Sequence, residues 1–335
     1  MNERENMQLV WEHKTPEWVP MLGTESQLIP LPEINDRSLF EDGTDWFGVK
    51  WELDPNQPLL MTHVVTGHPV FTDISRWREY LHFPAASELP WDAMKARTDM
   101  IWHDRDERMG YVVCAIGAFE RVNAVMGFED GLMALYDDIG AYKDLVNAYA
   151  DYRIDQFGYY KKYLAPDFLM MHDDWGNQKN MFLSPELWRE IFKEPERRMA
   201  AAAHDLGIYY MHHSCGYIEP IIPDLVEVGI DSWHSVSPVN NLAKIKAEFG
   251  DRLIFAGGVD PQVTDLPGVP EEEIRAEVRR AIDVLGKGGG YLCGSAVMQS
   301  TVAGVDAIIE DEGRKYGRYP TSAEDLISAS QRSES

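Results

Sequence analysis

Short apolar runs that alternate with longer amphipathic stretches dominate the sequence after Trp102. Parallel strands are buried on both faces and read as continuous apolar runs, whereas the helices that connect them show a period of about 3.6 residues. Most of the runs end in glycine or polar residues, and they are Tyr111–Ile116, Phe168–Met171, Ile208–Met211, Ser232–Val236, Leu253–Ala256 and Tyr291–Leu292. This alternation predicts parallel β/α units of the α/β class.

Helix signals lie between these runs. Ser184 before Pro185 is an N-cap followed by proline at the first helical position. Three acidic residues, Glu271–Glu273, open another helix, which Gly286 closes. With further strands expected before Trp102, the units predict a (β/α)8 TIM barrel with an N-terminal elaboration. A doubly wound open sheet is the alternative, but polar residues that follow several strands favour the barrel, whose active sites lie at that face.

The length of 335 residues suits one large barrel domain or two medium domains. We expect a single domain over residues 1–335. Its first hundred residues are rich in Pro and Trp and form the irregular elaboration, and residues 322–335 form a polar tail.

The composition excludes several classes of partner. Lys and Arg number 31 against 56 Asp and Glu, which gives a formal net charge of −25. That charge argues against binding to nucleic acid or to anionic lipid. The sequence contains no apolar run long enough for a membrane span and opens with polar residues. Three cysteines form no disulfide framework, so a reducing cytoplasm is expected.

His213 and Cys215, with the distant Cys293, are the strongest candidates for chemistry. In an extended backbone residues i and i+2 point the same way, so His213 and Cys215 can both face the barrel mouth. Cys293 follows the last strand and can reach that mouth from another side. One imidazole and two thiolates suit Zn2+ with an open fourth position. The alternative is that all three residues belong to the core.

Carboxylates and glycines follow other strands. Asp173 and Asp174 come directly after an apolar run, and Glu120 follows another, so we predict catalytic roles for all three. A turn or helix cap, or a surface ion pair, is the alternative for them. Gly257 and Gly258, with Asp260, allow close approach to a ligand or simply make a turn.

Other residues carry weaker signals. Cys114 lies inside an apolar run and is expected in the core. His63 and His68 are expected to be solvated loop residues. Four tryptophans can line a pocket for a flat ligand, namely Trp46, Trp51, Trp77 and Trp102. The sequence contains neither a dinucleotide-binding GxGxxG nor a Walker loop.

Several of these blocks resemble the uroporphyrinogen decarboxylase superfamily in order and spacing, from about residue 100 onward. The blocks are His172–Gly176, which Ser184–Pro185 follows, then His213–Ile218, Ile222–Leu225, Glu227–Asp231 and Phe255–Asp260. The resemblance implies a distorted (β/α)8 barrel. True decarboxylases of the family carry an early Arg-Gln-Ala-Gly-Arg-Tyr block, which is absent here.

The other branch of the family comprises the corrinoid-dependent methyltransferases, which bind zinc through a His-x-Cys motif and a distant Cys. His213, Cys215 and Cys293 fit this pattern. The resemblance implies a zinc enzyme that moves a methyl group from a small methylated donor, such as an aryl methyl ether, to the cobalt of a separate corrinoid protein. Three alternatives stay open: methyl transfer from methylcobamide to a thiol such as coenzyme M, a metal-free lyase, and a non-catalytic docking subunit.

Overall fold

The computed structural model describes residues 1–38, 42–53, 62–297 and 300–320. The chain divides into two compact units, which we describe separately. The central unit contains Leu28–His103 and Gly110–Asp231, and the terminal unit contains Met1–Gln27, Asp104–Met109 and the described part of Ser232–Ser335. The single domain predicted over residues 1–335 therefore stays a prediction, and the predicted tail, residues 322–335, lies outside the described residues.

Parallel strands form the core of the central unit. β5 (Met109–Cys114) pairs with β6 (Phe168–His172), which pairs with β7 (Tyr209–His213). Phe168, Leu169 and Met170 are fully buried, as expected for a strand covered on both faces. A separate antiparallel sheet has the order β2 (Gly43–Thr44), β3 (Lys50–Leu53) and β4 (Thr62–Val64).

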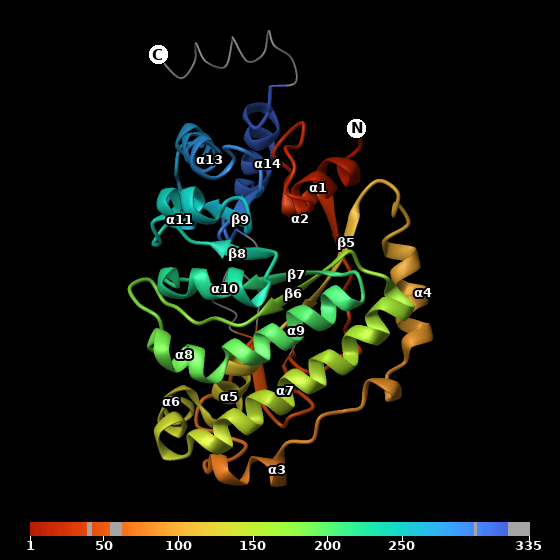
Figure 1. The fold of residues 1–335 in the computed structure, drawn as a ribbon, viewed down its shortest axis with the longest axis vertical. Coiled ribbons are helices and arrows are strands. Elements are labelled where there is room, and N and C mark those ends of the chain that lie inside the picture. Colours follow the sequence, from red (N-terminus) through yellow and green to blue (C-terminus); the bar gives the residue numbers. More distant parts are fainter. Residues whose placement is uncertain (39–41, 54–61, 298–299, 321–335) are drawn as a thin grey trace. The chain divides into compact units, whose positions relative to one another are not determined.

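Helices surround these strands, and Figure 1 shows α7 and α9 side by side. Ser184 caps α8 as predicted, because its Oγ accepts a hydrogen bond from the Leu187 amide at 3.2 Å. The helices of the central unit are η1 (Ile74–Arg76), α3 (Trp77–Tyr80), η2 (Ala86–Glu88), α4 (Trp91–Ile101), α5 (Ala118–Met126), α6 (Phe128–Asp137), α7 (Ile139–Tyr159), η3 (Tyr160–Leu164), α8 (Pro185–Ile191), α9 (Lys193–Asp205), η4 (Glu219–Ile221) and α10 (Ile222–Val228).

Two buried ion pairs fasten the irregular N-terminal segment of the central unit to its helices. The Arg153 guanidinium of α7 lies 2.6 Å from an Asp36 carboxylate oxygen, and that of Arg121 on α5 lies 2.7 Å from an Asp45 oxygen. All four side chains are almost fully buried, so loss of one partner would leave an uncompensated charge in the interior. The two pairs thereby anchor Asp36 to α7 and Asp45 to α5.

The terminal unit repeats the strand and helix alternation. β8 (Ser232–Val236) pairs in parallel with β9 (Ile254–Val259), which pairs with β10 (Tyr291–Ser295), and β1 (Ser26–Leu28) begins in this unit. The helices are α1 (Glu3–Trp11), α2 (Leu22–Glu25), α11 (Leu242–Phe249), α12 (Pro261–Thr264), α13 (Glu271–Leu285) and α14 (Val305–Tyr316). In the part of the chain that the structure describes, no helix is both long and apolar enough to cross a bilayer.

Candidate metal centre and cavity

The carboxyl ends of β6 and β7 bring two histidines together. His172 and His213 are register partners on these parallel strands. Their imidazole rings stack with centroids 4.1 Å apart and planes at 11°. The strands fix this pairing, because the apolar residues that precede each histidine are buried in the core.

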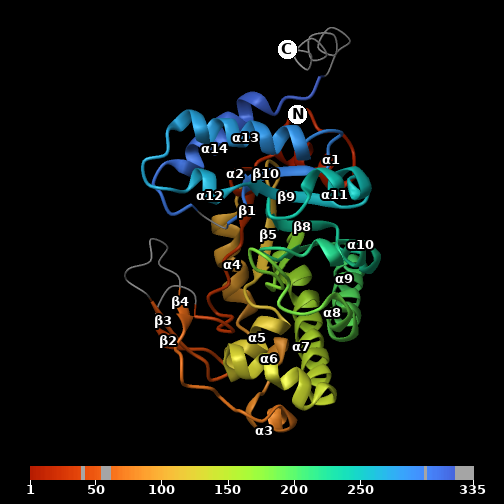
Figure 2. The same cartoon turned by 90° about the vertical axis from the view of Figure 1, so that its left-hand side faces the viewer.

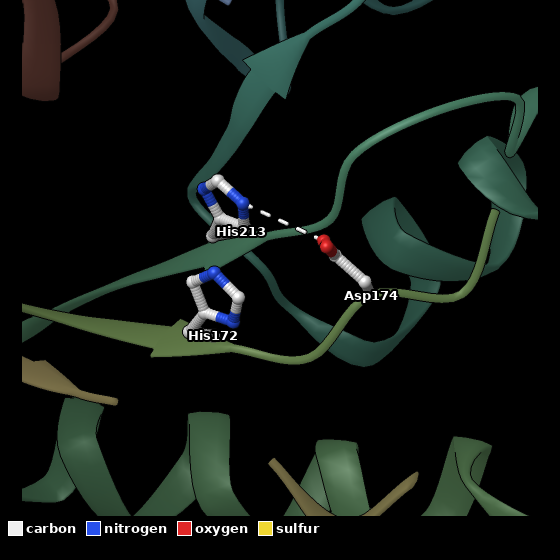
Figure 3. A group of neighbouring side chains, drawn as sticks. All are labelled: His172, Asp174 and His213. Atoms are coloured by element: carbon white, nitrogen blue, oxygen red, sulfur yellow. Dashed lines mark ion pairs between the residues drawn. The ribbon is translucent and has the colours of Figure 1, made fainter. Parts of the chain in front are cut away.

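Asp174 completes a group that can hold a metal ion (Figure 3). One ligand atom from each of His172, Asp174 and His213 lies within 4.8 Å of the other two. The Nε2 of His213 is 3.5 Å from Oδ1 of Asp174. Two imidazole nitrogens and a carboxylate oxygen form a donor set that zinc and other transition metals bind. The residues therefore fit a metal ion by their chemistry and their proximity.

Cys215 adjoins this group, so the structure brings two predicted ligands together. Its Sγ lies 3.3 Å from Nε2 of His213, and its backbone amide donates to Oδ1 of Asp174 at 2.6 Å. The thiol sulfur and the imidazole nitrogen thus face the same point, as the i and i+2 spacing predicted. Cys215 is a candidate fourth donor.

Glu120 orients His172. Its Oε2 lies 2.8 Å from Nδ1 of His172, which leaves the Nε2 of that ring for another partner. Burial disfavours the charged imidazole, but the charge and hydrogen bond of Glu120 outweigh it and raise the pKa of His172 to about 9. Burial likewise opposes ionisation of Glu120, yet His172 outweighs burial and lowers the pKa of Glu120. The two side chains form an ion pair, in which a bound metal ion would replace the Nε2 proton of His172.

Asp173 points away from this group and anchors α5. Its carboxylate accepts hydrogen bonds from the amides of Phe119 at 3.0 Å and Glu120 at 2.9 Å, and from the Trp175 indole at 3.2 Å. The side chain is fully buried, which together with the charge of Glu120 raises the pKa of Asp173 well above its ordinary value. Asp173 thus sits where it positions Glu120, and its predicted catalytic role stays a prediction.

A cavity of about 710 Å³ in the central unit adjoins the metal-binding group. Glu120 and Asp174 line it, and so do three phenylalanines of the wall, Phe119, Phe128 and Phe182. Residues of β3 and β4 also contribute, and Figure 2 shows this small sheet near α5 and α6. Trp51 lines the cavity as predicted, and His63 and His68, expected to be solvated, line it too.

The third predicted zinc ligand, Cys293, belongs to the terminal unit. It is fully buried, and a Cβ added at Gly313 of α14 would lie 3.8 Å from its Sγ. Burial raises the pKa of the Cys293 thiol to about 11. Its thiol is thus enclosed against a helix of its own unit, and its role as a metal ligand stays a prediction. Cys114 is buried, which confirms its expected place in the core.

The predicted ligand-binding glycines also lie in the terminal unit. Gly258 has a φ of +89°, and an added Cβ would lie 2.5 Å from the Leu285 side chain. Asp260 caps α12, because its Oδ1 accepts a hydrogen bond from the Gln262 amide at 2.9 Å. Backbone conformation, helix packing and capping therefore account for these residues, and ligand binding by Gly257, Gly258 and Asp260 stays a prediction.

Sequence reasoning did not identify His172 as a ligand. The signal was present: His172 and Asp174 stand two residues apart after a strand, and His213 follows the next strand. However, the stacking of the two histidines depends on the register of β6 against β7, and this register cannot be read from the sequence.

Comparisons with known proteins place this geometry in context. The model of the family described as Uroporphyrinogen decarboxylase (URO-D) matches residues 69–301. A comparison with curated proteins found no match.

Among solved structures, a methyltransferase from Methanosarcina mazei is similar with a TM-score of 0.68 and 16% identity, over 95% of this chain and 100% of that chain. A Xaa-Pro dipeptidase with bound methionine is similar with a TM-score of 0.30 and 14% identity, over 49% of this chain and 43% of that chain. This TM-score is too low to indicate a shared fold. The first likeness shows the fold alone. It is a TIM-barrel-like α/β fold with an N-terminal antiparallel sheet, so the predicted fold class is confirmed.

Proposed function

This chain belongs to the uroporphyrinogen decarboxylase family, and from that premise we propose that it is a zinc-dependent methyltransferase that moves a methyl group from a small methylated donor to the cobalt of a corrinoid protein. The observation that carries the proposal is the group of His172, Asp174 and His213 beside the cavity. The sequence lacks the Arg-Gln-Ala-Gly-Arg-Tyr block of true decarboxylases, which favours methyl transfer over decarboxylation.

The residues of the centre have separate tasks. Three of the four candidate donors His172, Asp174, His213 and Cys215 would hold the cation, and one position would remain for the methyl donor. Glu120 keeps Nδ1 of His172 occupied, so that Nε2 is the nitrogen offered to the cation. Asp173 fixes Glu120 through its backbone amide. A bound zinc ion supplies Lewis acidity to the oxygen of the methyl donor, while the reduced corrinoid of the partner supplies the nucleophile.

The cavity positions the donor. Phe119, Phe128 and Phe182 offer an apolar wall on which a flat ring can lie. Asp174 and Glu120 line the same cavity, so a donor bound there would have its ether oxygen within reach of the cation site. The chain therefore contributes binding and orientation, and the methyl group moves between the donor and the partner's cofactor.

The test combines metal content with methyl transfer. We expect about one zinc per chain, and methyl transfer from a methoxyphenol to reduced cobalamin. His213→Ala should lose both, whereas His82→Ala, which removes an exposed histidine of the same unit, should lose neither. Full methyl transfer by the metal-free protein would refute the proposal. Transfer from methylcobalamin to coenzyme M, without activity on any methoxyphenol, would replace the aryl ether donor by the thiol alternative.

A further inference from the structure

Arg37 is a guanidinium on the wall of the cavity. Its Nη1 donates to the backbone oxygen of Ala115 at 3.2 Å, and its Cζ lies 5.2 Å from the centre of the Trp51 ring. Within residues 1–38, 42–53, 62–297 and 300–320, its buried Nε has no hydrogen-bond partner and no carboxylate forms an ion pair with it. The carboxylate of the preceding residue, Asp36, forms its ion pair with Arg153 instead. Among the described residues, no carboxylate is therefore paired with the Arg37 guanidinium.

None of the described carboxylates that line the cavity forms an ion pair with Arg37. Glu120 is paired with His172 at 2.8 Å, and Asp174 faces His213 and the Cys215 amide. Glu129 and Asp130 line the cavity from the first turn of α6, where both are exposed. Among the described lining residues, Arg37 is the only arginine or lysine.

The wall of the cavity indicates the shape of what Arg37 would hold. The ring centres of Phe119 and Phe182 are 5.9 Å apart, and those of Phe128 and Phe182 are 5.3 Å apart. Three neighbouring phenylalanines form an apolar surface that suits a flat ring rather than a flexible polar chain. A cation and an aromatic wall in one cavity suit a ring that carries an anionic group.

We propose that Arg37 binds the anionic group of an aromatic methyl donor, so that the substrate class is a methoxylated aromatic carboxylate. This inference rests on the proposed function for the identity of the methyl donor. A guanidinium presents two parallel N–H donors to a carboxylate, which gives both charge neutralisation and a fixed orientation. The protein as a whole carries a net charge of −25, so an anionic substrate requires a local cation of this kind.

Binding of two isosteric probes to the full-length protein tests the proposal without any turnover. The probes are 4-methoxybenzoate and the neutral 4-methoxybenzamide, and isothermal titration calorimetry gives Kd for both. Because hydrogen bonds to charged groups are strong, the wild-type protein should bind the benzoate at least about tenfold more tightly than the amide. Arg37→Gln should reduce this preference to within about twofold, whereas Arg252→Gln, which removes an exposed arginine, should preserve it.

Arg37→Lys keeps the charge but loses the planar fork, so it should show an intermediate preference and serves if the glutamine variant does not fold. Equal binding of the two probes by the wild-type protein would overturn the proposal, and so would an unchanged preference in the variant that folds. Binding and catalysis can fail separately. If the protein binds the benzoate through Arg37 but transfers no methyl group, the proposed function is wrong and the role of Arg37 stands. If it transfers methyl groups from neutral donors only, the role of Arg37 is wrong and the proposed function stands.

Discussion

The imidazole rings of His172 and His213 stack at 4.1 Å because the two residues are register partners at the ends of β6 and β7. Asp174 lies beside them, two residues beyond His172 on the same segment. The carboxyl ends of the neighbouring strands β6 and β7 thus supply three candidate metal donors. The arrangement leaves the orientation of His172 to a residue outside both strands, Glu120.

Glu120→Gln should weaken zinc binding without abolishing it. A carboxylate that holds the far nitrogen of a metal-bound histidine fixes the tautomer and the ring orientation, and its loss costs about 10- to 100-fold in metal affinity. Competition with a chromophoric chelator measures this change. Glu129→Gln, at an exposed carboxylate on the rim of the cavity, is the control and should bind zinc like the wild-type protein. Equal affinities for the two variants would show that Glu120 does not orient the ligand.

Cys215 and Cys293 should differ in their effect on zinc. The Cys215 sulfur adjoins Nε2 of His213, so Cys215→Ala should lower zinc affinity while the protein stays folded. Cys293 is enclosed against α14, so we expect Cys293→Ala to cost about 1 to 3 kcal/mol of stability, the usual range for a lost buried side chain, with zinc affinity unchanged.

Zinc content per folded chain and the midpoint of urea unfolding separate these two effects. A loss of zinc from the Cys293 variant equal to that of the Cys215 variant would instead support the ligand set predicted from the sequence.

The strands could be predicted from the sequence because burial on both faces leaves a local pattern. Ser232–Val236 forms a strand with the predicted bounds, and Phe168–Met171 is one residue shorter than the observed β6. The N-terminal region was harder, because its helices are short and weakly patterned. α1 was missed, although Asn2 and Glu5 form a capping box that marks its first turn.

The site could be predicted only in part, because strand register and side-chain direction depend on tertiary packing. His213 and Cys215 follow from the alternation of one strand, which is local. The contacts of Asp173 with α5 and of Glu120 with His172 join segments about fifty residues apart, so no spacing rule in the sequence reveals them. Asp173 contacts α5 whereas Asp174 contacts His213 and Cys215, and two adjacent residues of the same type do not reveal this difference in the sequence.

Gly117→Ala should destabilise the central unit strongly. A Cβ at Gly117 would lie 2.2 Å from Cβ of Asp173, and the close approach lets that carboxylate reach the amides of α5. Overpacking of this kind costs about 1 to 3 kcal/mol, and occasionally more. Gly158→Ala in α7 is the matched control, because an added Cβ meets nothing within 4 Å and should stabilise the helix by about 0.5 to 1 kcal/mol.

Urea unfolding followed by circular dichroism compares the Gly117 and Gly158 variants. Equal stability of both with the wild-type protein would mean that the contact between Gly117 and Asp173 is not tight.

Glu25 in the terminal unit should make stability depend on pH. Burial raises its pKa from 4.5 to about 7, while the Trp18 indole donates to both of its carboxylate oxygens, at 3.2 and 3.0 Å. Between these two values the folded state binds more protons at this group than the unfolded state does. The free energy of unfolding therefore falls as pH rises from about 4.5 to 7, by about 2 to 3 kcal/mol from this group.

Glu25→Gln removes this titration. The free energy of unfolding of the variant minus that of the wild-type protein should therefore be larger at pH 8 than at pH 5. Urea unfolding of both proteins at the two pH values measures this difference, in which all other titrating groups cancel. Glu248→Gln, at an exposed glutamate of the same unit, should show the same difference from wild type at both pH values. If the stability difference between Glu25→Gln and the wild-type protein is the same at both pH values, the pKa of Glu25 is the same in the folded and unfolded chains.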